Sequence, residues 1–128
     1  FNEDVRDQLH GWLPNRANEI CAQYGGSCDF EVRKGYPVLV NDAALTRKMR
    51  SAAIEFLGAS NVVDMDRRMG SEDFAFYTHA MPGCFYRLGT GSLGTAPRGL
   101  HTPTFDIDED ALRIGSGLMV SLALAGLR

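Results

Sequence analysis

The stretch Met69-Gly70-Ser71-Glu72-Asp73-Phe74-Ala75 leads from a glycine-containing loop into a short segment rich in aromatic residues. Ser71 is a good N-cap, and Glu72 and Asp73 would favour the positive end of a helix dipole. Met81-Pro82-Gly83 is a strong stop signal, because proline and glycine do not continue a helix. The stretch therefore predicts a short helix that opens at Ser71.

Upstream, apolar residues recur at spacings of three and four from Val5 to Tyr24, which predicts an amphipathic helix. Gly11 and Pro14 interrupt this pattern, and we expect a kink or a break near His10 because proline lacks the backbone N–H.

Two further helices are predicted on either side of the short one. The first has an apolar stripe over 45–57, with Asn41 as a good N-cap and Gly58 placed to end it. The second covers 109–126, with Asp108 as its cap and small residues that allow close packing on a sheet.

Three segments read as strands: 27–33, where polar and apolar residues alternate, 61–65 and 84–88. Helices that alternate with strands favour an α/β layer architecture.

A domain boundary is expected at Lys34-Gly35-Tyr36-Pro37, because glycine and proline favour a turn there. The expected domains are 1–35 and 36–128. A helix and strand of about 33 residues cannot bury their own apolar faces, so we expect a packing partner upstream of Phe1.

Composition excludes several classes of protein. The 128 residues include 45% hydrophobic and 23% charged residues, as in an ordinary globular domain, and the net charge of −3 disfavours nucleic-acid binding. No apolar run approaches the ~20 residues of a membrane span. Cys21, Cys28 and Cys84 are too few for a disulfide framework, so we expect reduced, mostly buried thiols in a cytoplasmic protein.

The segment Gly89-Thr90-Gly91-Ser92-Leu93-Gly94 matches a dinucleotide-binding glycine pattern, but Pro97 and Pro103 prevent the helix that such a site requires. We interpret it either as a loop whose N–H groups face a carboxylate or oxyanion, or as an ordinary connection. His10 and His79 read as surface residues. His101 lies in a loop, where catalytic and metal-binding groups tend to be placed.

The ordered motifs resemble one family of enzymes. They are Met69-Gly70-Ser71-Glu72-Asp73-Phe74-Ala75, Pro82-Gly83, Leu88-Gly89-Thr90-Gly91, Leu100-His101-Thr102-Pro103, Phe105-Asp106 and Asp108-Glu109-Asp110-Ala111-Leu112. Together they resemble the C-terminal part of the hippurate hydrolase and aminoacylase-like amidohydrolases, the D branch of peptidase family M20. The resemblance implies a zinc-peptidase-like α/β catalytic domain interrupted by a ferredoxin-like lid. Residues 1–35 would end the lid, and 36–128 would complete the catalytic domain.

The resemblance also implies chemistry. Family members hydrolyse the amide bond of N-acyl amino acids or related conjugates with two divalent metal ions, zinc or manganese, cobalt or nickel. The resemblance implies that His101 is a metal ligand and that Glu72 and Asp73 lie near the active centre. Capping of a helix is an alternative reason for two acidic residues at this place. The loop residues expected beside the substrate are Gly89, Thr90 and Gly91.

No catalytic residue is expected in this chain, because the general base and the other ligands would lie upstream, and one imidazole cannot hold two metals. We therefore expect the chain alone to bind no metal and to be inactive without the N-terminal catalytic portion. A homodimer through the lid is plausible. Two alternatives stay open: a truncated, non-catalytic interaction or regulatory module, and a metal-independent carboxylate-binding protein.

Overall fold

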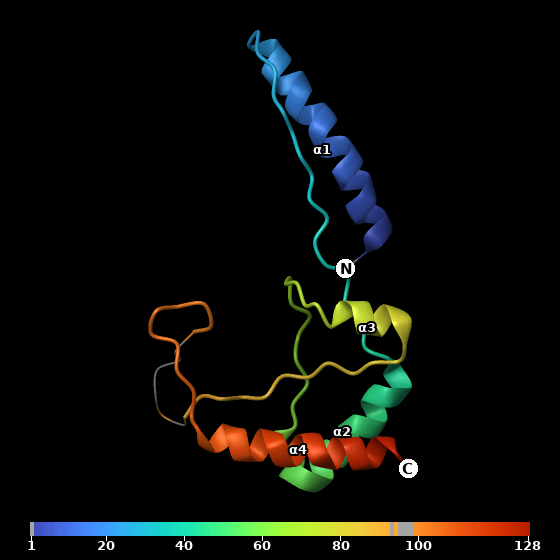
Figure 1. Cartoon of the computed structure of the whole chain (residues 1–128), viewed down its shortest axis with the longest axis vertical. Coiled ribbons are helices and arrows are strands. Elements are labelled where there is room, and N and C mark those ends of the chain that lie inside the picture. The colour runs from blue at the N-terminus through green and yellow to red at the C-terminus, as the bar shows by residue number, and fades with distance from the viewer. Residues whose placement is uncertain (1, 93, 95–98) are drawn as a thin grey trace. The chain divides into compact units, whose positions relative to one another are not determined.

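The computed structural model describes residues 2–92, 94 and 99–128 and contains helices joined by irregular segments (Figure 1). Its elements are α1 (Glu3–Gln23), α2 (Ala43–Leu57), the short 3₁₀-helix η1 (Ala59–Asn61), α3 (Ala75–Ala80) and α4 (Asp110–Gly126). The chain forms two compact units. Unit 1 comprises Phe1–Val40 and Arg68–Met81, and unit 2 comprises Asn41–Arg67 and Pro82–Arg128.

In unit 1, α1 is a single helix that begins where the sequence predicts. The side chain of Asn2 caps it by accepting a hydrogen bond from Val5 N at 3.1 Å. The helix continues through Gly11 and Pro14, so the prediction of a break near His10 is wrong. A proline removes only one backbone donor, and here the turns on both sides keep their hydrogen bonds.

The short helix of unit 1 begins later than predicted. Ala75 N donates to Glu72 O at 3.1 Å and Phe76 N donates to Asp73 O at 3.0 Å, so a tight turn precedes α3. Ser71 is therefore not the N-cap of this helix, which begins at Ala75. Ala75 is completely buried, and it anchors the short helix in unit 1.

Unit 2 is built on the packing of α2 against α4. The buried side chains of α4 are Ala111, Leu118 and Leu122. Gly117 permits a close approach, because a Cβ built there would lie 2.6 Å from the ring of Phe56. Gly115 likewise allows a close approach, because a Cβ built there would lie 2.7 Å from Leu88 Cδ2. Small residues of α4 thus serve close packing as expected, but in the described part of the chain they pack against a helix and an irregular segment and not against a sheet.

The start of α2 differs from the prediction, whereas its end agrees with it. Asp42, not Asn41, caps the helix, and its carboxylate accepts from Leu45 N at 2.7 Å. Gly58 ends α2 with a φ of 84°, a backbone conformation that favours glycine.

The described residues contain no β-strand, so the strands predicted at 27–33, 61–65 and 84–88 are not confirmed, nor is the α/β layer built from them. A strand exists only when its backbone hydrogen-bonds to a neighbouring strand, and these segments have no such partner among the described residues. Some of their apolar residues stay exposed. Val63 is 75% exposed and Phe30 is 41% exposed.

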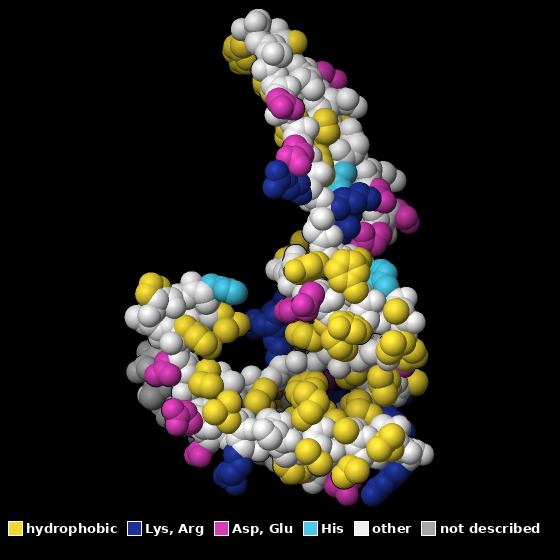
Figure 2. All heavy atoms as spheres, in the orientation of Figure 1, with side chains coloured by type: hydrophobic (Ala, Val, Ile, Leu, Met, Phe, Trp, Pro, Cys, Tyr) yellow, Lys and Arg dark blue, Asp and Glu magenta, His cyan; other side chains and the backbone are white. Residues whose placement is uncertain are grey.

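Apolar residues are also exposed on the helices. Figure 2 shows hydrophobic side chains at the surface over α4, where Leu112, Met119 and Val120 are each about 60% exposed. None of the helices in the described part of the chain is both long and apolar enough to cross a membrane.

Candidate functional site

The glycine loop of unit 2 is tied to the start of α4 by one residue, Asp108. Its backbone N–H donates to Thr90 O at 2.8 Å, and its carboxylate accepts from Ser92 Oγ at 2.9 Å. The other carboxylate oxygen of Asp108 accepts from Asp110 N at 3.0 Å. The N-cap of α4 is Glu109, so the prediction that Asp108 caps this helix is wrong by one residue. Asp108 therefore fixes the position of the loop relative to the helix.

The two glycines of this loop lie beside open space. A Cβ built on Gly89 or Gly91 would meet no atom within 4 Å among the described residues. Thr90 is half-buried between them. Such a loop can present backbone groups to a small molecule, but its glycines are not required by close packing. Leu93 of the glycine pattern, and Pro97, predicted to prevent a helix after it, lie outside the described residues.

His101 has an unusual backbone conformation. Its φ is 63°, and it is the one non-glycine residue with a positive φ in the described part of the chain. Thr102 Oγ1 donates to Gly99 O at 2.8 Å, which closes the turn that contains the histidine. The imidazole is exposed. A left-handed non-glycine residue stores strain of order 1 kcal/mol, and such residues cluster at functional sites.

Glu72 and Asp73 belong to unit 1, whereas His101 and the glycine loop belong to unit 2. Glu72 is half-buried and Asp73 is exposed, and their backbone carbonyls receive the first hydrogen bonds of the α3 turn. The N-cap of α3 is Phe74 and no acid lies in its first turn, so the prediction that these two acids cap the helix is wrong. Their role beside an active centre stays a prediction.

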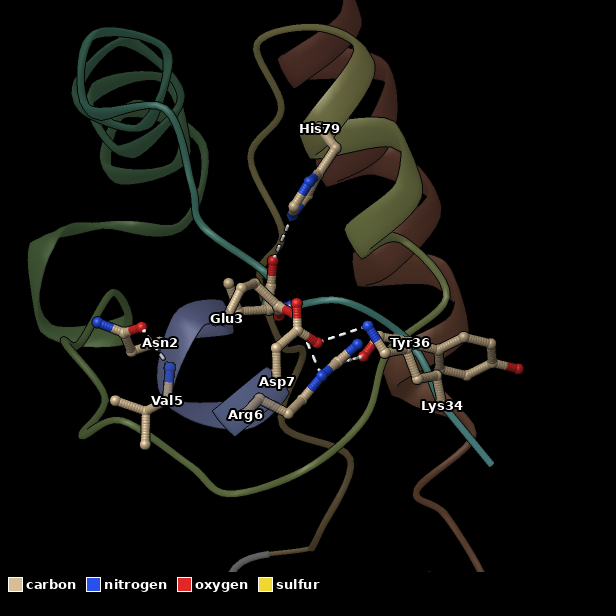
Figure 3. Close-up of polar contacts among 9 residues, drawn as sticks. Asn2, Glu3, Val5, Arg6, Asp7, Lys34, Tyr36 and His79 are labelled. Atoms are coloured by element: carbon tan, nitrogen blue, oxygen red, sulfur yellow. Dashed lines mark hydrogen bonds and ion pairs between the residues drawn. The ribbon is translucent and has the colours of Figure 1, made fainter. Parts of the chain in front are cut away.

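Sequence reasoning missed a polar cluster where α1 begins (Figure 3). Glu3 Oε1 accepts from Val38 N at 2.6 Å, and Arg6 Nη1 donates to Tyr36 O at 2.6 Å. Lys34 Nζ lies 2.5 Å from Asp7 Oδ1.

These contacts hold segment 34–38 against the first turns of α1. His79, at the end of α3, adds a bond of 2.9 Å between its Nε2 and Val38 O, and it is exposed as expected. The sequence carries no local signal for this cluster, because its partners are about 30 residues apart or more.

An apolar groove of about 240 Å³ lies in unit 2. It is lined by residues of α2, the 84–86 segment and α4: Leu45, Met49, Cys84, Tyr86, Met119, Leu122 and Ala123. Its lining contains no carboxylate or imidazole, so it lacks the groups needed for acid–base hydrolysis of an amide.

The profile of "Peptidase family M20/M25/M40" matches residues 3–125, almost the whole chain. The chain belongs to this family. The resemblance predicted from the ordered motifs is therefore confirmed.

Three members of the M20 group show the range of relatives. Over 127 residues the chain is 33% identical to a Bacillus subtilis (strain 168) protein provisionally named amidohydrolase YhaA, covering 97% of this chain and 32% of that protein. It is 37% identical over 94 residues to the IAA-amino acid hydrolase ILR1-like 4 of Arabidopsis thaliana, covering 73% and 21%. It is 27% identical over 129 residues to thermostable carboxypeptidase 2 of Saccharolobus solfataricus, covering 97% and 31%.

The chain thus spans about a third or less of the length of these M20 relatives. No solved structure matches it significantly. The relatives named as hydrolases place the chain in a hydrolase family.

Whether this chain can hold the metals that the resemblance implies depends on which of its side chains can act as metal ligands and lie close together. Across residues 2–92, 94 and 99–128, no three His, Cys, Asp or Glu side chains lie together in a group that could bind a metal ion. A catalytic zinc needs about three protein ligands. His101 supplies one exposed imidazole, so the described residues do not form a metal site by themselves.

Proposed function

We propose that the whole protein to which this chain contributes hydrolyses the amide bond of N-acyl amino acids or related conjugates. Membership of the M20 family carries the proposal, together with relatives named as an amidohydrolase and an IAA-amino acid hydrolase. Because the chain spans 32% of one relative and 21% of the other, the proposal concerns the complete enzyme. The chain alone is inactive in this proposal.

The complete enzyme depends on two divalent metal ions, zinc or manganese, cobalt or nickel. His101 is one of their ligands, and the other ligands and the general base come from outside residues 1–128. The strained turn of His101 supports this role, because a residue held at a φ of 63° points to a functional constraint. No catalytic step is assigned to the described residues, since they lack a donor cluster.

The remaining site residues act around the metals. Glu72 and Asp73 orient a ligand or the substrate, and Gly89, Thr90 and Gly91 form part of the substrate pocket. The open space beside Gly89 and Gly91 supports a pocket role, and the bonds of Asp108 to Thr90 and Ser92 keep the loop in place.

The finer fold belongs to the same proposal. Residues 1–35 end a ferredoxin-like lid that pairs subunits as a homodimer, and 36–128 complete an α/β catalytic domain in the cytoplasm. Segments 27–33, 61–65 and 84–88 then form strands with residues outside this chain. Their accessible apolar residues, such as Val63 and Phe30, support this pairing.

Metal content and hydrolysis of N-benzoylglycine test the proposal in the complete enzyme. We expect His101→Ala to lose bound metal and activity together, whereas His79→Ala keeps both. We expect the 128-residue chain, purified free of the complete enzyme, to show no metal-dependent hydrolysis. Unchanged metal content and rate in His101→Ala would refute the ligand role. Binding of a carboxylate ligand that a chelator does not affect, without hydrolysis, would favour the carboxylate-binding alternative.

A further inference from the structure

The chain reverses direction directly after α1. Gly25, with a φ of 71°, makes the turn, and Gly26 N donates to Cys21 O at 2.9 Å. The segment that follows then runs back beside the helix (Figure 1). This reversal places residues just after the turn against residues in the last turns of α1.

Two cysteines meet at this reversal. Cys28 Sγ donates to Asn18 Oδ1 at 3.4 Å, and Asn18 lies three residues before Cys21 on the same helix. Residues three apart are neighbours on a helix surface, so the sulfur of Cys28 lies against the face that carries Cys21. The contact with Asn18 therefore places the two thiols on neighbouring parts of the same surface of α1. Both are free thiols and half-buried, so small reagents can reach them.

Burial raises the pKa of the Cys28 thiol, and the neighbouring Cys21 raises it further. The thiol form therefore persists at neutral pH, in agreement with its donation to Asn18. Cys84 belongs to unit 2.

We propose that Cys21 and Cys28 are a redox-modification site, a dithiol that closes reversibly to an intramolecular disulfide by exchange with low-molecular-weight disulfides. The bond would join the last turns of α1 to the returning segment, with the turn at Gly25 already formed. The site is independent of amide hydrolysis and needs no metal.

The exchange balances in two steps. The thiolate of one cysteine attacks a small disulfide RSSR, which forms a protein–SR mixed disulfide and releases RS⁻. The thiolate of the second cysteine then attacks the protein sulfur of the mixed disulfide, which forms the Cys21–Cys28 bond and releases the second RS⁻. The two protein thiols lose two electrons and two protons, and RSSR gains them to give two RSH. Excess RSH reverses both steps.

Peptide mapping tests the site directly, because trypsin releases both cysteines in one peptide. Arg16 and Arg33 bound residues 17–33 with no Lys or Arg between them, and Cys84 lies in a different peptide, 69–87. The full chain is equilibrated with mixtures of reduced and oxidised glutathione, quenched with N-ethylmaleimide, digested and analysed by mass spectrometry. We expect peptide 17–33 to be lighter than its reduced, unalkylated form by the mass of two hydrogen atoms, and to carry no N-ethylmaleimide group. Cys84 should stay alkylated or carry one glutathione.

Unfolding and substitution distinguish a site built by the fold from simple proximity in sequence. Flexible linkers give effective concentrations of order millimolar, so the native turn should lower the oxidised glutathione needed for half-closure by about tenfold relative to the chain in urea. Cys21→Ser and Cys28→Ser should stop at the mixed disulfide, and Cys84→Ser, the matched control, should close as the unchanged chain does. Peptide 17–33 with two alkyl groups or two glutathiones, or equal closure in urea, would overturn the proposal.

Discussion

The side-chain amide of Asn41 pairs with both backbone groups of Phe85. Its Oδ1 accepts from Phe85 N at 2.8 Å, and its Nδ2 donates to Phe85 O at 2.8 Å. One amide thus satisfies a donor and an acceptor of the half-buried 84–86 segment, much as a neighbouring strand would. Next to it, Asp42 N donates to Gly83 O at 2.9 Å. These bonds connect the start of α2 to a segment more than 40 residues away.

Replacement of Asn41 should therefore destabilise unit 2. Asn41→Ala leaves the N–H and C=O of Phe85 without this partner in a half-buried place, so we expect a loss of about 1–3 kcal/mol in the free energy of unfolding. Urea denaturation followed by circular dichroism measures it. Asn61→Ala is the matched control, because the side chain of Asn61 donates one exposed hydrogen bond, to Leu57 O four residues earlier. An equal change in the two variants would contradict the prediction.

The cap of α2 should depend on Asp42, although the sequence also offers Asn41. We expect Asp42→Ala to cost about 1 kcal/mol, because Leu45 N loses its carboxylate acceptor, and Asp42→Asn to recover most of that loss. Thermal unfolding checks the order of the three proteins. Asp64→Ala serves as the control, since its ion pair with Arg50 is exposed and should contribute less than about 1 kcal/mol. A loss of stability in Asp64→Ala but not in Asp42→Ala would contradict the prediction.

Residues 41 and 42 also show what the sequence can predict. Helices follow from apolar spacing within one segment, and all four predicted helices are present, although α3 begins at Ala75 and not at Ser71. The choice between Asn41 and Asp42 as cap depends on Phe85, which lies in another segment. Local patterns cannot contain that information.

The strands and the site show the same limit more strongly. Alternation at 27–33 indicates which residues would share a face, but hydrogen-bonding partners make a strand, and none is present among the described residues. The ordered motifs identified the family, because they depend on residue order alone. They could not show the left-handed backbone of His101 or the bonds of Asp108 to the glycine loop.

The strain at His101 predicts an unusual response to glycine. Glycine adopts a φ of 63° without steric cost, so His101→Gly should be more stable than His101→Ala by about 1 kcal/mol. At His79, in the last turn of α3, the order should reverse, because glycine weakens a helix relative to alanine, by up to about 1 kcal/mol. Urea midpoints of the four variants of the full chain test both signs. If the glycine variant is less stable than the alanine variant at both positions, the backbone of His101 is not strained.

The ion pair of Asp7 and Lys34 predicts a pH dependence. The hydrogen bond from Lys34 holds the pKa of the Asp7 carboxyl below its usual value of 3.8, and the positive charges of Lys34 and Arg6 lower it further. A carboxyl with a lowered pKa in the folded state binds fewer protons there than in the unfolded chain at acid pH. Its stabilising contribution is therefore complete above the unfolded pKa near 3.8 and is lost as the pH falls through the folded value.

Lys34→Met should raise the pKa of Asp7 toward 3.8, as measured by NMR titration of the carboxyl carbon, and should reduce the acid-induced loss of stability below that pH. Both carboxyl and ammonium groups are more than half exposed, so added salt should narrow the difference between the two proteins. Lys48→Met removes an equal charge from α2 and should leave the titration of Asp7 unchanged. If Lys34→Met titrates as the unchanged chain does, the contact does not hold segment 34–38 to α1 in solution.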